Sequence, residues 1–137
     1  IVYKLKKEIK KNLKDNNVQA TVKGRQKSLF SLYRKIKYRK RPFNEILDVF
    51  AFRIIVNSVD DAYRSLGIVH NFYKPIENRF KDYVAIPKSN GYQALHTTLI
   101  ALEGIPIEVQ IQTKNMVEIA ENGVAVYGDI LRALGRG

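Results

Sequence analysis

Strict alternation of apolar and polar residues between Ile105 and Thr113 constrains the fold more than any other feature of the sequence. The apolar positions are Ile107, Val109 and Ile111, and the polar positions are Glu108, Gln110 and Gln112. Successive side chains of a strand point to opposite faces of a sheet. The segment therefore predicts a strand with one face in the core and one polar face.

A second run, Val49 to Val56, is rich in β-branched and aromatic residues and predicts a strand buried on both faces. Asp48 stands at its start and Arg53 lies within it. Because an unpaired buried charge is costly, each needs a partner: a metal, a ligand phosphate or a plain salt bridge. Asp48 and Arg53 fall on opposite faces of an ideal strand, so Asp48 must precede the strand proper or a bulge must intervene.

The remaining periodicity predicts one domain of mixed architecture. Apolar residues at helical spacing predict helices after Ile1, Ser28 and Ser58 and a further helix over 114–125. Ser28 and Ser58 are expected to cap the N-termini of their helices. Further strands are expected at 18–23, 80–86 and 97–102, with Gly24 ending the first of these. The order is helix, strand, helix, strand, helix, three strands and helix. It predicts an α/β (α+β) fold with a mixed sheet of about five strands flanked by helices.

The positive charge is unevenly placed. The net charge is +11, and residues 1–41 carry 15 Lys and Arg against Glu8 and Asp15. Such a field favours polyanions, either nucleic acid or nucleotide phosphates, although residues 4–14 alone could form a solvated lysine face. There is no Cys, which excludes a disulfide framework and a Cys-based metal site. No apolar run approaches the ~20 residues of a membrane span, so a cytoplasmic protein without membrane contact is expected.

Two stretches combine features that suit a nucleotide. From Arg79 to His96, a strand-like segment leads into the turn Lys88-Ser89-Asn90-Gly91, which Tyr92 follows. Lysine and arginine hold phosphates, and an aromatic ring can stack on a base, but an ordinary hairpin with surface lysines fits equally. Arg25 and Lys27 precede a predicted helix start that favours an anion; a charged outer face is the alternative.

These stretches resemble the RelA/SpoT alarmone synthetases. The sequence RFKDYVAIPKSNGYQALH follows that family's R-x-K-D-Y-I-A-x-P-K-x-N-G-Y-Q-S-L-H almost continuously. The family's G-R-x-K and E-[IV]-Q-[IV]-R-T motifs fall near Gly24 and at Glu108, so the resemblance runs from about Gly24 to Ala125. It implies a nucleotidyltransferase-like fold that transfers pyrophosphate from ATP to the 3′-OH of GDP or GTP.

The resemblance also implies a role for individual residues. Asp48 and Glu108 would be catalytic and would hold Mg²⁺, and Glu108 would also take the 3′-OH proton. The residues expected to bind ATP are Arg25, Lys27, Lys35 and Arg53. Those expected at GDP or GTP are Lys81, Lys88, Asn90, Tyr92, His96 and Gln110.

The same resemblance divides the chain into a linker helix at 1–17, a synthetase domain at 18–127 and a tail at 128–137. A chain that begins at Ile1 rather than Met is expected to be a piece of a longer one. The basic form of Arg79-Phe80-Lys81-Asp82 resembles the bifunctional members, which implies an upstream hydrolase domain and downstream regulatory domains. Any association with the ribosome would run through those parts. His70 is given no role.

Two departures from the family pattern leave other functions open. The Arg of E-x-Q-x-R-T is Gln112 here, and G-V-A-A-H-W reads with Val126-Tyr127. Either departure is consistent with a domain that binds nucleotide, turns over weakly and regulates an upstream hydrolase. A basic nucleic-acid-binding module ranks last, because no RNA-binding motif is present and aromatics are not interleaved with the early bases.

Overall fold

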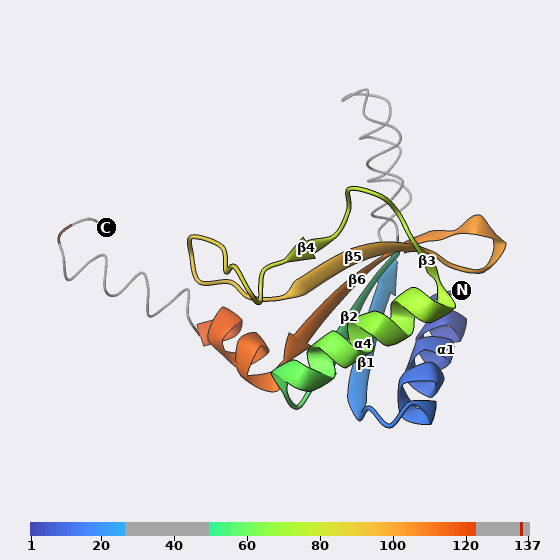
Figure 1. Ribbon diagram of the computed structural model, residues 1–137, viewed down its shortest axis with the longest axis horizontal. Coiled ribbons are helices and arrows are strands. Elements are labelled where there is room, and N and C mark those ends of the chain that lie inside the picture. Colours follow the sequence, from blue (N-terminus) through green and yellow to red (C-terminus); the bar gives the residue numbers. More distant parts are fainter. Residues whose placement is uncertain (27–49, 123–134, 136–137) are drawn as a thin grey trace.

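The computed structural model describes residues 1–26, 50–122 and 135, and in them six strands form one mixed sheet (Figure 1). Helices α1 (Val2–Asp15) and α4 (Val59–Phe72) accompany the sheet, with a 3-10 turn η1 (Leu102–Gly104) and helical residues 114–122. The strands are β1 (Ala20–Gln26), β2 (Phe50–Val56), β3 (Lys74–Pro75), β4 (Lys81–Asp82), β5 (Leu95–Ile100) and β6 (Pro106–Thr113). The predicted fold class, a mixed sheet flanked by helices, is confirmed.

The strand order is β1-β2-β6-β5-β3, with β4 also pairing with β5. Only the central pair β2 and β6 is parallel; the other pairs are antiparallel. Parallel neighbours need a crossover, and the chain between them includes α4, which packs on one face of the sheet (Figure 1). The central strands are therefore fixed by pairing on both sides.

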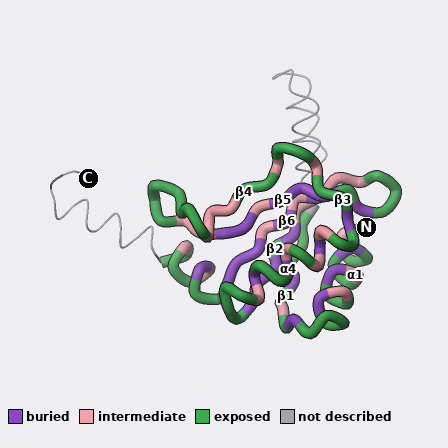
Figure 2. Tube along the Cα trace, viewed as in Figure 1, coloured by how far each residue is buried: buried purple, intermediate pink, exposed green. Residues whose placement is uncertain are grey.

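The core lies between the sheet and the two helices (Figure 2). Leu5, Ile9 and Leu13 of α1 are buried there, each contributing roughly 1.5–3 kcal/mol by leaving water. The helix expected as a linker at 1–17 thus shares the core cluster of the sheet. The sheet supplies the apolar residues of β2, β6 and β5: Phe52, Ile54, Val56, Ile107, Val109, Ile111, Leu95 and Leu99.

Helix α4 begins with the predicted cap. The Ser58 side chain accepts a hydrogen bond from the Asp61 N–H at 3.1 Å, and the acids at the first turn suit the helix dipole. The helix buries an apolar stripe that includes Ala62 and Val69, whereas Val59 at its start is 44% exposed. Ser65 is buried in the stripe instead, where its hydroxyl donates to the Asp61 carbonyl at 2.7 Å.

Gly24 was expected to end the first strand, but β1 continues through it to Gln26. A Cβ atom at position 24 would lie 2.7 Å from the Phe52 ring. Only glycine fits at this position, because the Phe52 ring lies against the backbone of β1. Gly24 does not end the strand.

The prediction of a strand over 80–86 is also wrong, because in that range only Lys81–Asp82 forms a strand. The Asp82 carboxylate accepts hydrogen bonds from the backbone N–H groups of Val84 and Ala85 at 2.9 and 2.8 Å, which turns the chain. Strand β5 begins at Leu95 instead of Thr97, and β3 was not predicted. The chain turns at Glu103-Gly104, where both residues have positive φ.

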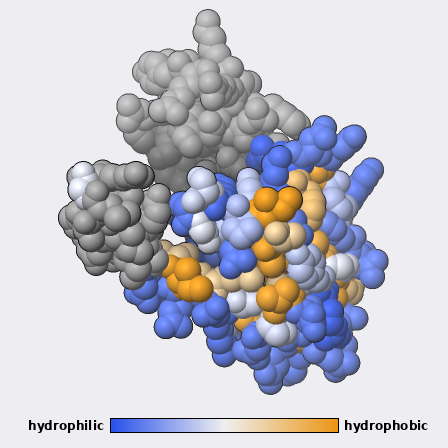
Figure 3. Space-filling view, turned by 60° about the vertical axis from the view of Figure 1, so that its left-hand side comes forward, coloured by the Kyte–Doolittle hydropathy of each residue, from blue (hydrophilic) through white to orange (hydrophobic). Residues whose placement is uncertain are grey.

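The composition of β2 predicted burial on both faces, but only its last residues, Ile54–Val56, are buried on both. Phe52, Ile54 and Val56 face the core, whereas Arg53 is exposed on the opposite face. The described surface is mostly hydrophilic in the view of Figure 3, with small separate apolar patches. In the residues that the structure describes, no helix has the length and apolar character to cross a membrane.

Candidate functional site

The face of the sheet opposite α1 and α4 carries two rows of polar side chains. Residues that pair in register on neighbouring strands point to the same face, so the pairing places each row across the sheet. One row consists of Lys23, Arg53, Gln110, His96 and Lys81, from β1, β2, β6, β5 and β4. The other consists of Arg25, Ala51, Glu108 and Thr98.

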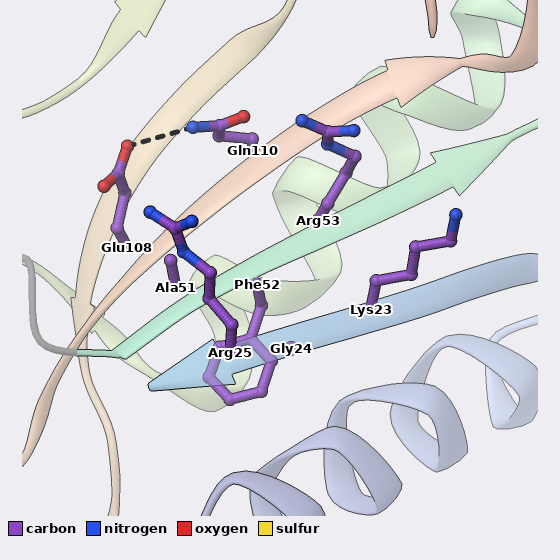
Figure 4. A pocket seen from close by; sticks show the side chains of 8 residues that line it. All are labelled: Lys23, Gly24, Arg25, Ala51, Phe52, Arg53, Glu108 and Gln110. Carbon is purple, nitrogen blue, oxygen red and sulfur yellow. Dashed lines mark hydrogen bonds between the residues drawn. The ribbon is translucent and has the colours of Figure 1, made fainter. Parts of the chain in front are cut away.

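A cavity of about 340 Å³, the first cavity, lies over β1, β2 and β6 (Figure 4). Three cations, Lys23, Arg25 and Arg53, line it, and none forms an ion pair with another described residue. Lys23 and Arg53 are direct cross-strand partners, an arrangement of like charges that costs stability. The positive potential at this cavity is suited to an anion such as a polyphosphate.

A second cavity of about 170 Å³ lies over β4, β5 and β6, and Arg79, Lys81 and His96 are among its lining residues. The side chains of the tetrad Arg79-Phe80-Lys81-Asp82 point alternately to the two faces at the edge of the sheet. Phe80 packs edge-on to His70 at 6.3 Å, and the Asp82 carboxylate accepts a hydrogen bond from the Tyr63 hydroxyl at 2.8 Å. The two basic residues of the tetrad therefore face the cavity, while its acid holds the turn to α4.

The hydrogen bonds of Asp82 also set its ionisation. Burial would raise the pKa of this carboxyl, but hydrogen bonds from the Ala85 N–H, the Tyr63 hydroxyl and the Val84 N–H outweigh burial and lower the pKa. The carboxylate form is thus the one that stabilises the turn.

Glu108 is the one acid that lines either cavity among the described residues, and it lines both. It is half-buried, and the Gln110 side chain donates to its carboxylate at 3.3 Å (Figure 4). The described residues contain no group of three His, Cys, Asp or Glu side chains that could hold a metal. Asp48, the predicted partner of Glu108, lies outside the described residues, although β2 does begin two residues after it.

Beside the second cavity, Tyr83, Tyr92 and His96 form an aromatic cluster. Their rings meet edge to face, with centroids 5.4 to 6.5 Å apart. The Tyr92 hydroxyl lies 2.9 Å from His96 Nε2. The Lys88 ammonium lies 4.8 Å from the centre of the Tyr83 ring and 5.6 Å from that of Tyr92, within the range of cation–π attraction.

The turn before Tyr92 is held by local hydrogen bonds. The Asn90 side chain accepts from the Tyr92 N–H at 3.0 Å, and the Lys88 N–H donates to the Tyr92 carbonyl at 3.1 Å. Gly91 has φ +83°, a conformation that glycine adopts without strain. Asn90 therefore shapes the turn, and the turn sets where Lys88 and Tyr92 lie.

Burial favours the uncharged forms of His96 and Tyr92. It lowers the pKa of His96, an effect that Glu108 opposes and Lys88 reinforces. It raises the pKa of Tyr92, with Arg53 opposing and Glu108 and Tyr83 adding to the rise. A neutral His96 can accept the Tyr92 hydroxyl proton in a hydrogen bond.

The structure brings most of the predicted residues together. Arg25, Arg53, Glu108 and Gln110 line the first cavity, and Lys81, His96 and Glu108 line the second. Tyr92 reaches the second through its hydrogen bond to His96, and Tyr92 and Asn90 line a further small cavity of about 70 Å³ together with Met116. The predicted Lys27, Lys35 and Asp48, the Ser28 cap and Val126-Tyr127 lie outside the described residues.

Sequence reasoning missed Lys23 and Tyr83. Lys23 is two residues from Arg25 on one strand, so a strand extended past Gly24 would have placed both on one face. Tyr83 follows Asp82, and nothing in the alternation predicted the turn that directs it to Tyr92. His70, which was given no role, pairs its Nε2 with Thr97 Oγ1 at 2.8 Å on the core side.

Known proteins of one family match this chain in sequence. A sequence model of the family described as "Region found in RelA / SpoT proteins" matches residues 24–127. Bifunctional (p)ppGpp synthase/hydrolase SpoT of Escherichia coli (strain K12) is 46% identical over 127 residues, which are 93% of this chain and 18% of that protein. A GTP pyrophosphokinase of Streptomyces antibioticus is 46% identical over 120 residues, 88% of this chain and 14% of that protein. The chain therefore spans less than a fifth of these relatives.

A solved structure shares the fold. Small alarmone synthetase 1 from Bacillus subtilis, bound to its product pppGpp, superposes with a TM-score of 0.65 at 23% identity. The match covers 93% of this chain and 75% of that one. At this identity the likeness shows the fold alone, and it agrees with the mixed sheet described above.

Proposed function

The chain belongs to the RelA/SpoT family, and on this premise we propose that it transfers pyrophosphate from ATP to the 3′-hydroxyl of GDP or GTP, giving (p)ppGpp and AMP. The observation that carries the proposal is the position of Glu108, which lines both cavities. A reaction between two nucleotides needs two binding sites that meet at one reacting group. The relatives named as a synthase and as a GTP pyrophosphokinase support the same reaction class.

We assign ATP to the first cavity. Arg25 and Arg53, together with Lys23, supply three cations from two neighbouring strands, none of them ion-paired among the described residues. They would neutralise the triphosphate, and the planar Arg53 guanidinium could also lie against adenine. Lys27 and Lys35 are proposed to add to this site.

We assign the acceptor nucleotide to the second cavity and the aromatic cluster. Tyr92 offers a ring for stacking on guanine, while Lys81 and Lys88 supply charge for the acceptor phosphates. His96 orients the Tyr92 hydroxyl, and Asn90 holds the turn. Gln110 would act through its hydrogen bond to Glu108.

In the proposed step, the Glu108 carboxylate takes the proton of the ribose 3′-hydroxyl. The 3′-oxygen then forms a bond to the β-phosphorus of ATP. The bond from that phosphorus to the oxygen bridging the α- and β-phosphates breaks, and AMP leaves. The cations of the first cavity stabilise the charge that develops on the transferred group.

The site also fits Mg²⁺. Magnesium in phosphate-transfer sites commonly has one or two carboxylates and the substrate phosphates as ligands. Glu108 offers a partly exposed carboxylate between the two cavities, and Asp48 is the proposed second ligand. The ion would neutralise phosphate charge during transfer.

The test is a transfer assay with ATP labelled at the γ-phosphate and with GDP, comparing the chain with Glu108→Gln. We expect the variant to lose about 10²- to 10⁴-fold in turnover, the usual contribution of a general base, while still binding each nucleotide. Glu118→Gln, an exposed carboxyl on the helical segment 114–122, is the matched control and should behave as the unmodified chain. Wild-type turnover by Glu108→Gln would overturn the proposal.

The departure at Gln112 favours a second candidate, a domain that binds both nucleotides but turns over slowly and regulates a hydrolase domain elsewhere in the protein. Relatives that carry a hydrolase name agree with such a partner domain. The same assay separates the candidates, because the second predicts nucleotide binding with little labelled product. We propose in either case that further regulatory domains act on the chain in the full-length protein.

A further inference from the structure

We propose that Gln112 is a positioning residue, which fixes the aromatic cluster through a chain of two hydrogen bonds. Its Nε2 atom donates to the Gln93 carbonyl at 2.9 Å, and the Gln93 side chain donates in turn to the Val84 carbonyl at 3.2 Å. The chain connects strand β6 to the segment that carries Tyr92 and to the turn that carries Tyr83. The link to acceptor binding rests on the proposed function.

The segment needs such a connection because strand pairing does not hold it. Residues 83–94 lie between β4 and β5 and contain no strand. Backbone hydrogen bonds from the Tyr83 N–H to the Ala94 carbonyl and from the Lys88 N–H to the Tyr92 carbonyl close this loop on itself. The Gln112 bond joins the backbone of the loop to the central strand β6, whereas the Tyr92–His96 bond joins only a side chain of the loop to β5.

Gln112 is well suited to this role by its burial. Its side chain is only 2% exposed, and no buried side-chain N or O atom of the described residues is left without a partner. A buried amide that loses its partner pays the full cost of desolvation, so the hydrogen bond restrains both ends. Because Gln93 directly follows Tyr92, the bond restrains the backbone that carries the Tyr92 ring.

This role gives the departure at position 112 a new interpretation. The resembled family has arginine here, so this chain lacks one positive charge at that position. Arginine and glutamine both present N–H donors, so the substitution keeps the donor while it removes the charge. We infer that the donor is the property that the loop requires.

The experiment measures amide hydrogen exchange of residues 83–94 in Gln112→Met, which keeps the side-chain size but removes the donor. We expect faster exchange in that segment and unchanged exchange in α1. Affinity for GDP should fall about fivefold to tenfold, the effect of one lost hydrogen bond, while affinity for ATP stays unchanged. Gln112→Arg, which restores a donor, should return both quantities toward those of the unmodified chain.

Ser65→Ala removes another buried side-chain hydrogen bond, within α4, and serves as the control for a general loss of stability. If Gln112→Met does not fold, Gln93→Ala breaks only the bond to Val84 and should speed exchange of residues 83–86. Unchanged exchange in both variants would overturn the inference. Absence of GDP binding by the unmodified chain would overturn the proposed function instead, because the exchange comparison does not depend on it.

Discussion

The two cavities share Glu108, but their other residues are held in different ways. Around the first cavity, Lys23, Arg25 and Arg53 lie on long strands whose pairing fixes the face to which each side chain points. The second cavity is also lined by strand residues, Lys81 and His96, but the neighbouring Tyr92 and Lys88 lie on a loop that side-chain and local backbone hydrogen bonds hold. Sheet register therefore places the whole first side of the site, whereas individual hydrogen bonds place the aromatic part of the second.

This difference predicts different sensitivities. A change that shifts a strand should move every cation of the first cavity together. A change that removes one hydrogen bond should loosen the second cavity and leave the first intact, because local opening is cheapest where few contacts hold the chain. Three experiments can break or sharpen this comparison, in addition to those above.

The largest effect is expected from removing one cation on each side, with Arg53→Met and Lys81→Met. A hydrogen bond to a charged group contributes about 1.5–3 kcal/mol, or roughly 10- to 100-fold in affinity. We expect Arg53→Met to raise the KM for ATP and Lys81→Met to raise the KM for GDP, measured by steady-state kinetics.

Lys10→Met is the matched control, because it removes the same charge from an exposed position on α1. It should leave both KM values unchanged. If Arg53→Met and Lys81→Met both raised the KM of the same nucleotide, the assignment of the two cavities to different nucleotides would be contradicted. An equal effect of all three variants would instead favour a general attraction of the basic N-terminal region for polyanions.

A smaller effect is expected from Gly24→Ala. The new Cβ would lie 2.7 and 2.8 Å from two carbons of the Phe52 ring, so the ring or β1 must move. We expect a loss of about 1–3 kcal/mol in the free energy of unfolding, together with weaker ATP binding because Arg25 is the next residue. GDP affinity should be unchanged, as measured by titration calorimetry beside urea denaturation.

Gly67→Ala on α4 is the control for the glycine itself. Nothing lies within 4 Å of the added Cβ, so the substitution should stabilise the chain by about 0.4–1 kcal/mol. Normal ATP binding by a destabilised Gly24→Ala would show that register does not place the cations.

The same distinction explains what the sequence could predict. The alternation around Glu108 identified the core and site faces of β6 because pairing in the centre of a sheet makes side-chain direction periodic. Lys23 was missed only because Gly24 was taken to end the strand, whereas it accommodates Phe52. That contact joins two distant strands, and no local pattern encodes it.

The loop side was predicted less well from physics alone. The family resemblance selected Tyr92, Lys88 and His96, but periodicity extended a strand through Tyr83 that ends at Asp82. Asp82 accepts hydrogen bonds both from the distant Tyr63 and from the backbone of its own turn. Which of these contacts an aspartate makes depends on the fold around it. The sequence identified Gln112 only as a departure from the family's arginine, because its hydrogen bond to Gln93 forms only with the loop in place.

The smallest effect concerns pH and again separates the two sides. His70 packs against Phe80, which precedes β4, and pairs with Thr97 of β5 on the core side of the sheet, and burial lowers its pKa. The folded chain then binds the proton less tightly than the unfolded chain. The stability due to neutral His70 is fully present above the unfolded pKa of about 6.5 and is lost as the pH falls through the lower folded pKa.

We therefore expect the free energy of unfolding to fall between about pH 7.5 and pH 5.5, and to fall less in His70→Gln, which cannot gain the proton. Burial shifts the pKa of His96 in the same direction, so part of the fall should persist in that variant. Because the described part of the first cavity contains no histidine, acidification should speed amide exchange around β4 and β5 before it affects β1 and β2. Equal acceleration on both sides would mean that the loop side is as firmly held as the strands, and the comparison would fail.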